Sequence, residues 1–116
     1  MYTLEEAREQ LLKLRPRIDA LIVRRADLAE LRADLDAGQA SPHGRLAEAK
    51  AWEAELYAGL EALADTGAHV KGFAPLLLDW PGERDGVPVL WCWLEGDADI
   101  GWYHRLDCGF AGRRRI

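Results

Sequence analysis

The stretch VPVLWCWLEGDADIGWYHR, residues 87–105, decides how the second half of the chain folds. Residues 87–94 and 99–105 are short runs rich in β-branched and aromatic side chains, and EGDA at 95–98 has the composition of a turn. This pattern is typical of two antiparallel strands joined by a turn. The stretch therefore predicts a β-hairpin near the end of the chain.

A loop at Gly96 and Asp97 would set the register of this hairpin and would pair Trp91 with Trp102. Because side chains alternate between the two faces of a strand, this register assigns every residue to a face. One face carries Val89, Trp91, Trp93, Ile100, Trp102 and His104, and the other carries Leu90, Cys92, Leu94 and Tyr103. A loop of different length would pair the strands differently.

Both faces of the predicted hairpin are apolar, whereas a sheet with one face in water alternates apolar and polar residues. Helices can cover one face, so the other needs a second copy of the chain, a small ligand, another protein, or the chain's own tail. Aromatic side chains are enriched at protein interfaces. We therefore predict that the second face forms a homodimer, with an unknown protein partner or a small ligand as the alternatives.

Further strands are expected before the hairpin. PLLLDW (75–80) is an apolar run, HVKGF (69–73) is a weaker candidate, and PGERDG (81–86) has turn chemistry. Short apolar runs separated by turns indicate an antiparallel meander. The sequence thus predicts a sheet of three or four strands.

The first half of the chain has a helical period. Apolar residues recur in steps of three and four over residues 4–35 and again over 46–65, with the turn-forming segment DAGQASPHGR (36–45) between them. Such spacing is typical of amphipathic helices. Because the connection between them is short, the two helices are predicted to form an antiparallel hairpin.

Two local features refine the first helix. Thr3 and Glu6 have the spacing of a capping box, in which each side chain bonds the backbone amide of the other residue. Pro16 lies inside the helical pattern, which continues in phase on both sides. We therefore expect a kink or a short break at Pro16 rather than the end of the helix.

The predicted fold class is α+β. A long antiparallel helical hairpin packs on a small three- to four-stranded antiparallel β-sheet. The chain of 116 residues fits one domain. Residues 1–66 form the helical hairpin, and residues 67–116 form the β-meander and a C-terminal tail.

Composition narrows the function classes. The formal net charge of −5 disfavours broad nucleic-acid binding, which requires a surplus of basic residues. No apolar run approaches the roughly 20 residues that span a membrane, and the polar, acidic N-terminus does not resemble a signal peptide. Two cysteines do not make a disulfide framework. We expect a cytoplasmic protein that binds neither nucleic acid nor membrane.

Candidate site residues gather in the last quarter of the chain. His104 and Asp107 could form a polar pair in which the carboxylate orients the imidazole. Such a pair binds ligands as often as it catalyses, and the alternative is a structural turn after a strand. These two residues are the first candidates for a ligand site.

Cys92 with His104 is open to two further interpretations. With Cys108 and an aspartate they could hold zinc, but the spacing lacks a CxxC pair. They could also be a nucleophile and its base, although flanking tryptophans would raise the thiol pKa. A buried structural cysteine is favoured over both, so we expect no metal, no cofactor and no catalytic residue.

The remaining candidates are Trp93, Trp102 and Arg113. The tryptophans flank the cysteine and the histidine along the strands. Arg113, in the closing sequence GFAGRRRI, could bind a phosphate or a carboxylate. The expected state of this basic tail is a solvated one.

Four segments resemble a small bacterial family, the domain of unknown function family 2203. They are YTLEEA (2–7), LRP (14–16), VLWCW (89–93) and WYHRLDCGFAGR (102–113), so the resemblance covers nearly the whole chain. The positions that match the family pattern are Cys92, Trp93, Trp102, His104, Asp107, Gly109, Gly112 and Arg113. At Cys108 this chain differs from the small residue usual in the family. The resemblance supplies a class but no reaction.

The function predicted from these observations is a non-enzymatic cytoplasmic protein that self-associates and binds a partner or a small ligand through the sheet. The alternative is a small enzyme or metal-binding protein with its site around His104 and Asp107. A weaker third hypothesis is an adaptor whose helical hairpin docks on a larger assembly.

Overall fold

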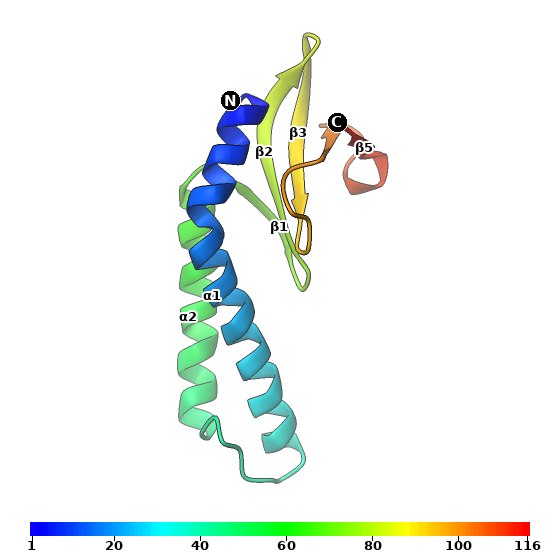
Figure 1. The fold of residues 1–116 in the computed structure, drawn as a ribbon. Helices are drawn as coiled ribbons and strands as arrows, with labels where there is room; N and C mark the ends of the chain where they lie inside the picture. Colours follow the sequence, from blue (N-terminus) through cyan, green and yellow to red (C-terminus); the bar gives the residue numbers. More distant parts are fainter. The chain divides into compact units, whose positions relative to one another are not determined.

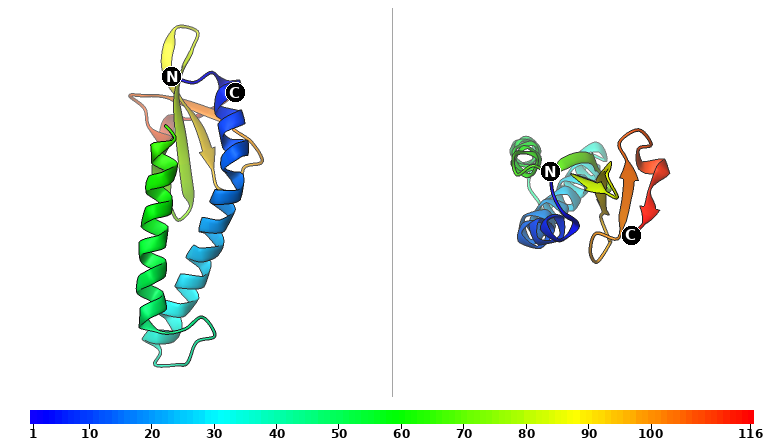
Figure 2. Two further views of the ribbon diagram at one scale, coloured as in Figure 1. Left: turned by 90° about the vertical axis from the view of Figure 1, so that its left-hand side faces the viewer. Right: turned by 90° about the horizontal axis from the view of Figure 1, so that it is seen from above.

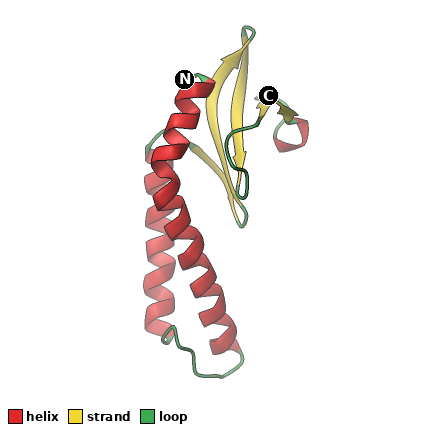
Figure 3. Cartoon of the chain, in the orientation of Figure 1, coloured by secondary structure: helices red, strands yellow, loops and turns green.

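The computed structural model describes residues 1–116 and confirms the α+β class. Its elements, shown in Figures 1 and 3, are α1 (Leu4–Asp36), α2 (Leu46–Asp65), β1 (His69–Phe73), β2 (Leu76–Arg84), β3 (Val87–Leu94), β4 (Trp102–Arg105), the 3₁₀ turn η1 (Phe110–Gly112) and β5 (Arg114–Arg115). The strands form one antiparallel sheet in the order β1-β2-β3-β4-β5. The sheet has five strands rather than three to four, because the C-terminal tail pairs with β4.

The chain divides into two compact units. One unit is residues 15–62, and the other combines residues 1–14 with residues 63–116. This boundary differs from the change of sequence period at residue 66, because the first turns of α1 belong with the sheet. Neither helix is both long and apolar enough to cross a membrane.

The unit of residues 15–62 is an antiparallel helical hairpin, as predicted (Figure 2). Its helices approach closely at Gly59, where an added Cβ atom would clash with a methyl group of Leu21. Across the hairpin, Arg24 pairs with Glu55 at 3.2 Å and Arg32 pairs with Glu53 at 2.8 Å. Residues on the facing sides are buried, namely Ile18, Leu21, Leu28, Leu31, Ala49 and Leu56.

The start of α1 carries the predicted capping box. The amide of Glu6 donates to Thr3 Oγ1 at 3.1 Å, and the amide of Thr3 donates to Glu6 Oε1 at 2.9 Å. The hydrogen bond from the Thr3 amide holds the pKa of Glu6 below its ordinary value. The helix then continues through Pro16 without ending.

The register of the β3–β4 hairpin differs from the prediction by one residue. Trp91 pairs with Tyr103 rather than with Trp102, and Cys92 pairs with Trp102. The connection runs from residue 95 to residue 101, and a turn in which the amide of Asp97 donates to Leu94 O ends β3. Because a slip of one residue moves every side chain of a strand to the opposite face, the predicted placement of Trp102, Tyr103 and His104 was wrong.

The corrected register defines the two faces of the sheet. The first face carries Trp80, Trp91 and Trp93, and the start of the chain lies against it. There the indole of Trp91 donates to Tyr2 O at 2.9 Å, and the amide of Tyr2 donates to Pro81 O at 2.7 Å. The first face is therefore covered within the same unit.

The second face carries Asp79, Cys92, Trp102 and His104. The C-terminal segment folds back beside β4 (Figure 2), and the Arg113 guanidinium lies 4.5 Å from the ring of Trp102. The prediction of a solvated tail was wrong for Arg113, which lies against the rings of Trp102 and Phe110, whereas Arg114 and Arg115 are exposed as predicted. The apolar second face consequently has a cover from its own chain.

Candidate functional site

Three adjacent strands place three chemically active side chains together on the second face. Asp79 is on β2, Cys92 pairs with it from β3, and His104 follows on β4. Their relative exposures are 2%, 0% and 4%. Asp79 and His104 are the only buried charged or polar residues of the chain. Since burying such groups is unfavourable unless they are paired, their common position marks the chemically unusual part of the fold.

Hydrogen bonds fix the orientation of His104. Its Nδ1 lies 2.9 Å from Arg105 O, and its Nε2 lies 3.2 Å from Asp79 Oδ2. A backbone carbonyl only accepts, so Nδ1 carries the proton that it donates. Nε2 therefore lies against a carboxylate oxygen, and that short contact is favourable when a proton or a metal ion lies between the two atoms.

Arg113 supplies the positive charge beside this cluster. Its guanidinium is held between the rings of Trp102 and Phe110, 4.5 and 4.3 Å from their centres, and its positive charge acts to lower the pKa of the Cys92 thiol. Three buried side-chain atoms have no hydrogen-bond partner within the chain: Asp79 Oδ1 and Arg113 Nη1 belong to this cluster, and Trp80 Nε1 lies on the first face. The cluster therefore offers one acceptor atom, Asp79 Oδ1, and one donor atom, Arg113 Nη1, to a ligand.

The environment of Cys92 disfavours nucleophilic catalysis. Burial, together with the neighbouring Asp79 carboxylate, raises the pKa of its thiol to about 12, and Arg113 only partly offsets this effect. At neutral pH the side chain is a protonated, solvent-excluded thiol. A catalytic cysteine needs the opposite, a depressed pKa and access for substrate.

Four of the residues singled out from the sequence come together here: Cys92, Trp102, His104 and Arg113. Trp93 does not, because it lies on the first face, where its indole donates to Asp97 O at 2.9 Å.

The predicted pairing of His104 with Asp107 was wrong. Asp107 is exposed beyond the end of β4, where both of its oxygens accept hydrogen bonds from Arg105. Those bonds hold the pKa of Asp107 below its ordinary value. The carboxylate that contacts His104 is instead Asp79, which is distant in sequence.

Sequence reasoning missed Asp79. Its signal was present, because PLLLDW places one carboxylate inside an apolar strand. A charged residue in a strand that is otherwise buried requires a partner. In the predicted register, which differs by one residue, His104 lies on the face opposite Cys92, so the sequence does not point to His104 as the partner of Asp79.

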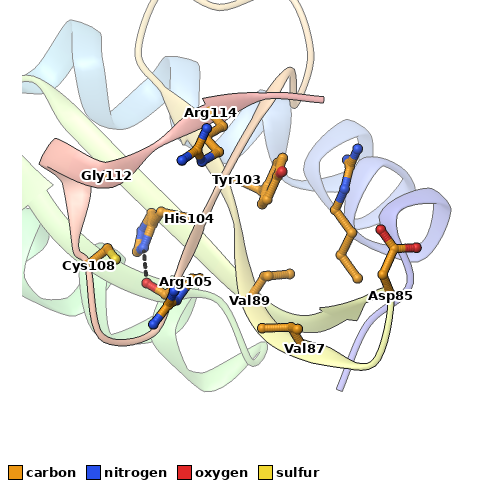
Figure 4. A pocket seen from close by; sticks show the side chains of 10 residues that line it. Asp85, Val87, Val89, Tyr103, His104, Arg105, Cys108, Gly112 and Arg114 are labelled. Carbon is orange, nitrogen blue, oxygen red and sulfur yellow. Dashed lines mark hydrogen bonds between the residues drawn. The ribbon is translucent and has the colours of Figure 1, made fainter.

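A pocket of about 320 Å³ lies next to this cluster and shares His104 with it. Three arginines line it, Arg84, Arg105 and Arg114, with Asp85 as its one acidic residue. Figure 4 shows Asp85 and Cys108 at opposite sides of the pocket, with His104 hydrogen-bonded to Arg105. The lining is therefore basic, although the chain as a whole is acidic.

Comparison with known proteins identifies the family. The model of a family described as "Uncharacterized conserved protein (DUF2203)" matches residues 1–116, so the chain belongs to this family. No curated protein and no solved structure matches the chain.

Proposed function

We propose that this member of the DUF2203 family is a bacterial cytoplasmic binding module rather than an enzyme, and that its ligand is a small anion. The observation that carries the proposal is the pocket lined by Arg84, Arg105 and Arg114, with one aspartate among its other lining residues. Guanidinium groups suit carboxylates and phosphates, because their planar donors match two oxygens at once. Both cysteines are free, as is usual in a reducing compartment.

The three arginines differ in whether their guanidinium groups are already paired with a carboxylate. Arg105 is already paired with Asp107, whereas the guanidinium of Arg84 lies 4.4 Å from the ring centre of Tyr103 and forms no ion pair. Stacking on an aromatic ring holds a guanidinium in place and leaves its donors available at the edge. Arg84 and the unpaired Arg114 are thus the two residues proposed to bind the anion.

Calorimetric titration with inorganic phosphate and, separately, with citrate tests the proposal. At least one anion is expected to bind at one site per chain, and Arg84→Ala or Arg114→Ala should weaken it about 10-fold, since a charge-assisted hydrogen bond contributes roughly 1.5 kcal/mol. Arg45→Ala, an exposed arginine outside the pocket, is the matched control and should bind normally. Absence of binding by both anions, or equal weakening by the control, would refute the proposal.

Self-association is proposed separately. Because the tail covers the second face, a homodimer would have to use other apolar residues, and Val87 and Leu106 are 45% and 59% exposed in the sheet unit. Native mass spectrometry is expected to give twice the chain mass, and Leu106→Glu should return the mass of one chain. A single-chain mass for the unmodified protein at micromolar concentration would contradict self-association.

A further inference from the structure

We propose that Asp79, Cys92 and His104 bind a zinc ion on the second face of the sheet. This inference goes beyond anion binding, because none of the three pocket arginines belongs to the metal site. One donor atom from each of the three residues lies within 4.8 Å of the other two. Thiolate sulfur, imidazole nitrogen and carboxylate oxygen are the ligand types that zinc uses in proteins.

The distances fit a zinc site with little adjustment. Zinc–ligand bonds of 2.0–2.3 Å in a tetrahedron place neighbouring donor atoms roughly 3.3–3.8 Å apart. His104 Nε2 and Asp79 Oδ2 are already 3.2 Å apart, and Cys92 is paired directly with Asp79 across β2 and β3. All three donor atoms lie within 4.8 Å of one another, so side-chain shifts on the order of 1 Å bring them to the tetrahedral separation.

The orientation of His104 is the one that a metal ligand requires. Its Nδ1–H donates to Arg105 O, and this hydrogen bond orients the ring so that Nε2 points toward Asp79. Metal-binding histidines characteristically donate their second ring N–H to a carbonyl or carboxylate. Zinc would take the place of the proton that His104 Nε2 and Asp79 Oδ2 share in their hydrogen bond, and Asp79 Oδ1, which has no partner, remains available to it.

Charge balance indicates the class of the fourth ligand. On binding, zinc replaces the thiol proton of Cys92, which leaves to solvent. The dication, the thiolate and the Asp79 carboxylate cancel, so the nearby Arg113 leaves one positive charge at the site. We expect the open fourth position to take a small anion such as hydroxide or chloride, stabilised by the unpaired Nη1 of Arg113.

A second group of possible ligands serves as the comparison. Asp27, Glu30 and His43 also lie within reach of one another in the helical hairpin. This group has no thiol, Glu30 is exposed, and His43 is already bonded to Glu30 at 2.6 Å. It provides a matched control in the same chain.

Cobalt and zinc loading of the full chain, freed of metal with a chelator, test the site. We expect one Zn²⁺ per chain by native mass spectrometry. Co²⁺ should give the intense near-ultraviolet charge-transfer band of a cobalt–thiolate bond together with the visible bands of a tetrahedral ion. Cys92→Ser should abolish the charge-transfer band, and Asp79→Asn or His104→Gln should lower metal affinity at least 10-fold.

The controls locate the metal. Cys108→Ser and His43→Gln should keep both stoichiometry and spectrum. Absence of bound metal in the unmodified protein, a cobalt spectrum without the charge-transfer band, or loss of the ion with His43→Gln would each overturn the proposal. The spectrum of the unmodified protein decides the question even if a variant fails to fold. Because the readout is metal content, failure here leaves the anion titration unaffected.

Discussion

Asp79→Ala is expected to lower the free energy of unfolding by about 3 kcal/mol. The carboxylate is 2% exposed and contacts Nε2 of His104 at 3.2 Å. Removing one member of a buried, charge-assisted pair leaves the other without compensation, which costs roughly 3–5 kcal/mol. Urea unfolding of the metal-free protein, followed by circular dichroism, measures the change.

Asp107→Ala is the control for this substitution. Asp107 is exposed and its partner Arg105 is exposed as well, so its loss should leave the urea midpoint unchanged. Equal destabilisation by the two substitutions would mean that the buried cluster has no special role in the fold.

Trp93→Ala is expected to lower the free energy of unfolding by about 4 kcal/mol. The side chain is 1% exposed on the first face, and its indole also donates to Asp97 O at the turn after β3. Large-to-small substitutions of buried aromatic residues cost roughly 3–5 kcal/mol through lost burial and the cavity left behind. Thermal and urea unfolding report the loss, and Trp93→Phe, which keeps part of the volume, should lose less.

Tyr57→Ala is the matched aromatic control. Tyr57 is 66% exposed on α2, so its replacement should change stability by no more than about 0.5 kcal/mol. If Trp93→Phe retained full stability but lost anion or metal binding, Trp93 would be a ligand residue after all, and its assignment to the core would be incorrect.

Much of the fold could be predicted because its signals are local. Helical periodicity, the Thr3–Glu6 capping box and the turn at 36–45 each depend on residues close in sequence, and all three appear in the structure. The β3–β4 register, in contrast, is not determined by a local signal. It depends on the geometry of the connection from 95 to 101, and one residue there exchanges the faces of Trp102 and His104.

The exchange of faces also explains why the predicted carboxylate partner of His104 was wrong. Asp107 is the carboxylate nearest to His104 in sequence, whereas Asp79 lies 25 residues away on another strand. Arg113 was similarly assigned to a solvated tail, since its partners Trp102 and Phe110 come together only when the tail folds back. Residue types could be chosen from the sequence, but their partners depend on contacts between strands.

A double-mutant cycle on His104 tests most directly whether the buried cluster, rather than the turn beyond β4, is the centre of this protein. The unfolding free energies of Asp79→Asn, His104→Gln and the double variant are compared in metal-free buffer, with Asp107→Asn in a parallel cycle. The structure predicts a coupling of about 1–2 kcal/mol between His104 and Asp79, and additive effects for His104 and Asp107. Additive effects with Asp79, or coupling with Asp107, would contradict the account.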